Sequence, residues 1–167
     1  MLPLVKFLYY VSVLIALALL FFSYYQFPEY VSIGYSENTA LKELKSKSDL
    51  FYIGAGLFII LNALLMILKK LVNYLPYKML PMPSKGFWLQ SSESQLALEK
   101  ANIVWLNSFG IILNLFIAFL YLTLFLINVV QFGNFSNYIP IIYGFIILMS
   151  IWWIVLPIRL LYKKYEI

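Results

Sequence analysis

Residues 101–130 read ANIVWLNSFGIILNLFIAFLYLTLFLINVV, a stretch that contains no Asp, Glu, Lys or Arg. Three more uncharged, apolar runs accompany it: Phe7 to Tyr25, Leu50 to Leu68 and Tyr138 to Ile158. A helix needs roughly 20 apolar residues to cross the hydrocarbon core of a bilayer. Open sheets leave backbone groups unpaired in lipid, and none of the runs alternates polar and apolar residues as barrel strands do. The sequence therefore predicts an all-α membrane protein with four transmembrane helices.

We expect these helices at about 7–26, 50–71, 92–130 and 138–160, in one domain, with loops at 27–49 and 72–91. The third run is longer than one span, so its helix is predicted to begin before the membrane, where Ser92 and Gln95 fit a capping box. The first run is interpreted as a retained helix, because no small-x-small cleavage site follows it.

Local patterns give further predictions. The alternation in residues 28–35 indicates a short extended segment, whereas residues 37–48 have helical composition, with Asn38 or Thr39 as a cap. Pro140 is expected in the first turn of the fourth helix, where proline is tolerated. Pro157 is expected to kink or end that helix.

Composition limits the classes of function that the protein can have. Hydrophobic residues make up 63% of the chain and charged residues 11%, whereas soluble domains have a lower apolar and a higher charged fraction. The sequence contains neither Cys nor His, so thiolate chemistry and the commonest metal ligands are excluded. No phosphate loop or hydrolase motif occurs. We therefore expect no cofactor, no metal, no nucleic-acid partner and no enzymatic activity.

The distribution of basic residues predicts the orientation. Three lysines precede the second helix on the loop 27–49: Lys42, Lys45 and Lys47. All the other basic residues fall on the opposite side: Lys6, Lys69, Lys70, Lys78, Lys85, Lys100, Arg159, Lys163 and Lys164. Under the positive-inside rule, both termini and the loop 72–91 are cytoplasmic and the loop 27–49 is external.

A few polar or small residues interrupt the apolar runs. Asn107 and Asn114 are seven residues apart and share a helix face, with Gly110 between them. Asn62 should lie at a similar depth to Asn114, so an interhelical amide hydrogen bond is predicted, and a solute site is the alternative. Gly54 and Gly56 offer a small-residue face near the external end of the second helix.

Two segments carry a family resemblance. Residues 27–33, FPEYVSI, are followed by Asn38 and by Lys47 just before the second helix, and residues 83–89 read PSKGFWL. This arrangement resembles the SdpI-like bacterial integral membrane proteins, although Gly34 stands where that family commonly has His. The resemblance implies a bacterial inner-membrane protein, and the best-known member confers immunity to a secreted toxin and signals its presence.

Three functional hypotheses remain open. The first is a non-enzymatic protein that contacts membrane lipid and binds another membrane or periplasmic protein, as an accessory subunit or an immunity or sensor factor. Its candidate contact residues are Pro28, Tyr30, Ile33, Tyr35, Phe87 and Trp88. The second is a small-solute transporter or channel that uses Asn62, Asn107 and Asn114. The third is an intramembrane or lipid-modifying enzyme that relies on Glu29, Glu93 or interfacial tyrosines.

Overall fold

The computed structural model describes residues 2–35, 42–74, 84–132 and 135–162. Within these ranges, four helices are long and apolar enough to cross a membrane: α1 (Leu2–Gln26), α2 (Lys47–Tyr74), α4 (Ser92–Asn128) and α5 (Ile139–Tyr162). The predicted fold class, an all-α membrane protein with four transmembrane helices, is confirmed.

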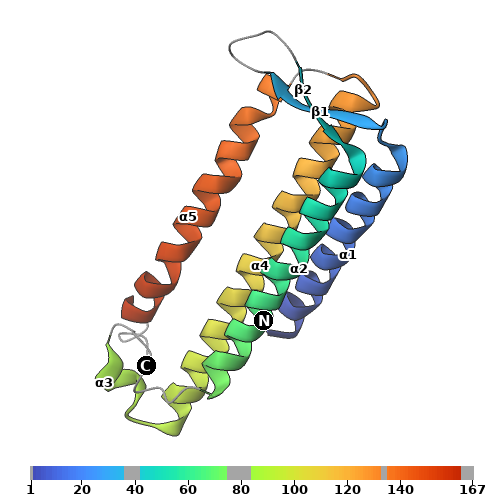
Figure 1. The fold of residues 1–167 in the computed structure, drawn as a ribbon. Coiled ribbons are helices and arrows are strands. Elements are labelled where there is room, and N and C mark those ends of the chain that lie inside the picture. The colour runs from blue at the N-terminus through green and yellow to red at the C-terminus, as the bar shows by residue number, and fades with distance from the viewer. Residues whose placement is uncertain (1, 36–41, 75–83, 133–134, 163–167) are drawn as a thin grey trace.

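Helix α4 is the centre of the bundle. It packs against α1, α2 and α5, and α1 also packs against α2. Figure 1 shows α5 on one side of α4, with α1 and α2 on the other. One end of the bundle carries the two strands, and we call it the hairpin end. At the other end α1 begins and α5 finishes; this basic end holds Lys6, Lys69, Lys70, Lys85, Lys100 and Arg159.

Two glycines allow tyrosines to pack between helices. A Cβ atom on Gly110 of α4 would lie 2.6 Å from the Tyr9 ring of α1 and 3.1 Å from Leu65 of α2. A Cβ atom on Gly54 of α2 would overlap the hydroxyl of Tyr121 from α4. A Cβ atom on Gly56 would meet nothing within 4 Å. Of the two glycines predicted to form a packing face on α2, Gly54 does so and Gly56 does not.

The two strands form an antiparallel hairpin between α1 and α2. Strand β1 (Tyr30–Tyr35) confirms the extended segment that alternation predicted, and it pairs with β2 (Lys42–Ser46). The helix predicted over residues 37–48 is therefore wrong over 42–46, because pairing with β1 outweighs local helical composition. Its suggested caps, Asn38 and Thr39, lie outside the described residues. Ser46 Oγ accepts from the Asp49 N–H at 3.0 Å, so α2 starts at Lys47.

Helix α4 starts at Ser92, as predicted, but its N-cap is one residue earlier than the predicted capping residue. Ser91, in extended conformation, is the N-cap, and its side chain accepts from the Ser94 N–H at 3.2 Å. Ser94 Oγ accepts from the Ser91 N–H at 3.3 Å, which completes a capping box. The predicted pair, Ser92 with Gln95, is wrong. Ser91 and Ser92 are consecutive, so either could be the N-cap, and at Ser94 a serine takes the place of the usual Glu or Gln.

Helix α5 does not end at its internal proline. Pro140 lies in its first turn, as predicted, and the helix continues beyond Pro157 to Tyr162. Tertiary contacts extend past the proline: Leu160 is buried, and the backbone oxygen of Leu160 accepts a hydrogen bond from Trp88 at 3.2 Å. Of the two effects predicted for Pro157, a kink or an end of the helix, the structure excludes the end, because these contacts stabilise the last turn.

Candidate functional site

A polar network joins three helices in the interior of the bundle. Tyr9 Oη of α1 donates to Asn62 Oδ1 of α2 at 2.8 Å. Asn62 Nδ2 donates to Asn114 Oδ1 of α4 at 2.9 Å, and Asn114 Nδ2 donates to Ser12 Oγ at 3.3 Å. Ser12 Oγ in turn donates to the Tyr9 carbonyl at 2.7 Å. The predicted interhelical bond between Asn62 and Asn114 is confirmed.

The network contains no charged group, and its two amides are hydrogen-bonded to protein groups. Asn114 is fully buried and Ser12 is 2% exposed, and each carboxamide has partners for both its oxygen and its nitrogen. Asn62 Nδ2 also donates to the Phe58 carbonyl at 2.9 Å. Buried amides that satisfy one another stabilise helix association, at about 0.6 kcal/mol per bond on average. This arrangement holds α1, α2 and α4 in register and leaves Asn62 and Asn114 engaged with protein groups.

Asn107 lies outside this network, although it was predicted on the same face as Asn114. Its Nδ2 donates to the Ile103 carbonyl of its own helix at 2.8 Å, and the residue is 3% exposed. It borders a crevice of about 310 Å³ between α1, α2 and α4 at the basic end. The structure thus brings together two of the three predicted asparagines and separates the third.

The hairpin is clamped to the bundle by Asn128, the last residue of α4. Asn128 Oδ1 accepts from the Ser32 N–H at 2.7 Å, and Asn128 Nδ2 donates to the Ser32 carbonyl at 3.0 Å. The carboxamide thus pairs with β1 as a neighbouring strand would. Val31 is fully buried beneath the hairpin, and the Lys47 N–H donates to the Glu29 carbonyl at 3.0 Å. These contacts hold the hairpin in one orientation on the bundle.

The face of the hairpin that points away from Val31 carries exposed apolar side chains. Tyr30 pairs with Ser46 and Ser32 with Leu44, so Tyr30 and Leu44 lie on the same face. They are 61% and 54% exposed. Of the other predicted contact residues at this end, Pro28 is exposed and Ile33 is half-buried at an irregularity in the strand register. The prediction for the Tyr35 side chain lies outside what the structure describes.

The second pair of predicted partner-contact residues packs against other parts of the same chain. Phe87 and Trp88 lie in the short helix α3 (Lys85–Trp88). Trp88 is fully buried, with its Nε1 donating to the Leu160 carbonyl and its ring packed with Leu98 and Leu160. Trp88 therefore offers no surface to a partner, which corrects its assignment as a contact residue. Phe87 is half-buried against it.

Several important residues escaped prediction. Tyr9 and Tyr121 were not distinguished from other aromatic residues, although each is buried against a glycine and Tyr121 Oη donates to the Leu50 carbonyl at 2.6 Å. The role of Asn128 was not predicted either, because its contact with Ser32 depends on how the hairpin lies against the end of α4. Among the described residues, no group of three or more His, Cys, Asp or Glu side chains is arranged to hold a metal ion.

Comparison of the chain with protein-family models, with curated proteins and with solved structures finds no match. The fold is that of a multi-pass membrane protein whose β-hairpin is held against the helix bundle.

Proposed function

We propose that the protein is a non-enzymatic protein of a bacterial inner membrane whose hairpin binds another protein, as an accessory subunit or as an immunity or sensor factor. Both termini are cytoplasmic in this proposal, so the hairpin faces the periplasm. The basic end carries most of the positive charge, which supports this orientation. The resemblance to the SdpI-like proteins gives the same expectation.

The observation that carries the proposal is the combination of a fixed hairpin and an exposed face. Asn128 and the buried Val31 hold the strands in place, so binding would not have to order them first. Preorganisation of this kind improves affinity because less conformational entropy is lost on association. Tyr30 and Leu44 supply an aromatic and an aliphatic group on the outward face, and Tyr is enriched among residues that dominate binding energy.

The transporter alternative receives less support. Asn62 and Asn114 satisfy one another, Tyr9 and Ser12, so neither amide is directed at a solute path. Asn107 borders a crevice at the basic end and takes no part in a continuous row of polar groups with the other two. We therefore interpret Asn62 and Asn114 as structural residues.

The experiment compares partner recovery by tagged full-length variants expressed at native level. In Tyr30→Ala/Leu44→Ala, we expect recovery of a stoichiometric protein partner to fall at least tenfold, because a hot-spot aromatic contributes about 2 kcal/mol or more. Asn128→Leu should also weaken recovery, since it releases the hairpin while leaving its outward side chains intact. Gentle-detergent capture with quantitative mass spectrometry measures the effect.

Tyr25→Ala is the matched control, because Tyr25 is 83% exposed at the same end of the bundle but belongs to α1. It should recover the partner as the parent protein does. A partner retained equally by the hairpin double variant would contradict hairpin recognition. A parent protein that yields only itself and lipid would contradict the proposed function.

A further inference from the structure

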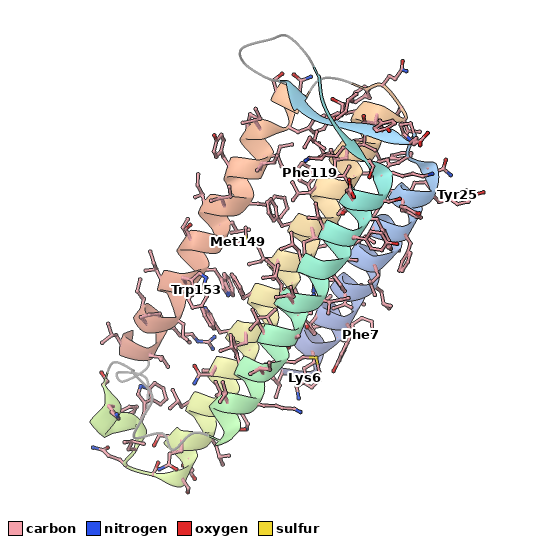
Figure 2. All side chains as sticks on the ribbon, in the orientation of Figure 1. Lys6, Phe7, Tyr25, Phe119, Met149 and Trp153 are labelled. Carbon is pink, nitrogen blue, oxygen red and sulfur yellow. The ribbon has the colours of Figure 1, made fainter. Side chains whose placement is uncertain are left out.

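A crevice at the basic end brings three lysines together. It has a volume of about 310 Å³ and lies where α1, α2 and α4 meet, with Lys6 from α1 and Lys69 and Lys70 from α2 in its lining. Among the described residues that line it, none is acidic. Figure 2 shows Lys6 at the lower end of α1, on the α2 side of the bundle. The crevice therefore concentrates positive charge on the described surface.

One of the lysines is positioned by the interior network. Lys69 Nζ lies 3.6 Å from the centroid of the Tyr9 ring, a cation–π contact, and Tyr9 Oη is fixed by its bond to Asn62. Asn107 also lines the crevice, with its Nδ2 bonded to the Ile103 carbonyl. Three ammonium groups suit a ligand that has several acceptor oxygens on one anionic centre, and a phosphate group meets this description.

The surroundings indicate where the phosphate comes from. Phe7, Tyr10 and Met66 are 63%, 65% and 58% exposed, and Tyr10 and Met66 line the crevice. All three lie on helices that are long and apolar enough to cross the membrane, so their exposed surfaces face acyl chains. The lysines lie near the ends of those helices, at the depth where phospholipid headgroups begin. A soluble phosphate ion would not contact these exposed apolar side chains.

We infer that this crevice binds the headgroup phosphate of an anionic phospholipid, with Lys6, Lys69 and Lys70 around the phosphate and the acyl chains along α1 and α2. The bound lipid would join the ends of these two helices beside the Tyr9–Asn62 contact. The inference goes beyond the proposed partner binding at the hairpin and does not depend on it.

The test is lipid retention by the full-length protein, measured by native mass spectrometry from micelles with equal phosphatidylglycerol and phosphatidylcholine. The parent protein should retain phosphatidylglycerol preferentially. Lys69→Gln/Lys70→Gln should reduce that preference about 30-fold, the loss expected for two basic residues at an anionic headgroup. Lys6→Gln/Lys70→Gln changes two exposed lysines and leaves the Lys69–Tyr9 contact, so it should show a similar loss even if Lys69 is needed for folding.

A matched control separates a site from general attraction to the basic end. Lys100 and Arg159 line a different crevice, between α1, α4 and α5 at the same end. Lys100→Gln/Arg159→Gln removes the same charge and should leave the phosphatidylglycerol preference unchanged. An equal loss of phosphatidylglycerol preference in Lys69→Gln/Lys70→Gln and in Lys100→Gln/Arg159→Gln would overturn the inference. So would an unchanged preference in both Lys69→Gln/Lys70→Gln and Lys6→Gln/Lys70→Gln. Displacement of the lipid by millimolar inorganic phosphate would also overturn it, by showing that a soluble anion is the ligand.

Discussion

Gly54→Ala is expected to lower the free energy of unfolding by about 1–3 kcal/mol, the usual cost of overpacking a well-packed interior. The new methyl group would occupy the position of the Tyr121 hydroxyl. Tyr121 would have to move, and its hydrogen bond to the Leu50 carbonyl would be lost. Equilibrium unfolding in mixed micelles, with Tyr121→Phe as a variant that removes the hydroxyl, measures this effect.

Gly56→Ala is the matched control, because it makes the same change on the same helix where nothing lies within 4 Å. It should be neutral or stabilising, since alanine favours a helix interior over glycine by roughly 0.5–1 kcal/mol. In the Tyr121→Phe background, Gly54→Ala should cost less than it does alone. Equal effects of Gly54→Ala and Gly56→Ala would show that α2 and α4 do not pack as described.

The second large effect is expected at the interior amides. Asn114→Leu removes the acceptor of one Asn62 Nδ2–H, and Asn62 keeps only its bonds to Tyr9 and the Phe58 carbonyl, so a polar N–H is left unsatisfied in an apolar interior. We expect each single change, Asn62→Leu or Asn114→Leu, to cost about 1–3 kcal/mol. The double variant should cost less than the sum of the two, because neither amide is then left without its partner. A double-mutant cycle of unfolding free energies tests this coupling.

Ser150→Ala serves as the control for loss of a polar group, since Ser150 is exposed and bonds to the Ile146 carbonyl of its own helix. It should change stability by less than the amide variants. Additive costs at Asn62 and Asn114 would contradict their direct hydrogen bond. Leucine variants that stay fully stable but lose flux of a solute would favour the transporter alternative instead.

The long helices were predictable because lipid imposes one simple requirement on them. A span must be apolar over about 20 residues, and hydropathy alone reveals such runs. The depth of a residue in the membrane follows from its position along such an apolar run. This is why Asn62 and Asn114 could be paired from the sequence and were then found 2.9 Å apart between Nδ2 and Oδ1.

The remaining features depend on contacts between distant segments. Residues 42–46 have helical composition, but β1 offers them backbone pairing, and Ser46 then caps the next helix. Tyr9 and Tyr121 differ from other tyrosines only in facing a glycine on a neighbouring helix, which no local pattern reports. Trp88 was predicted to contact a partner from its place in the loop 72–91, yet Leu98 and Leu160 enclose it.

The most direct test of the central claim, an outward-facing hairpin on a four-helix membrane protein, is cysteine labelling. The chain contains no cysteine, so single replacements give an unambiguous signal. With a membrane-impermeant maleimide on intact cells, Leu44→Cys in the hairpin should be labelled directly. Glu93→Cys at the basic end should be labelled only after the cells are permeabilised. Labelling of Glu93→Cys but not Leu44→Cys in intact cells would contradict the account.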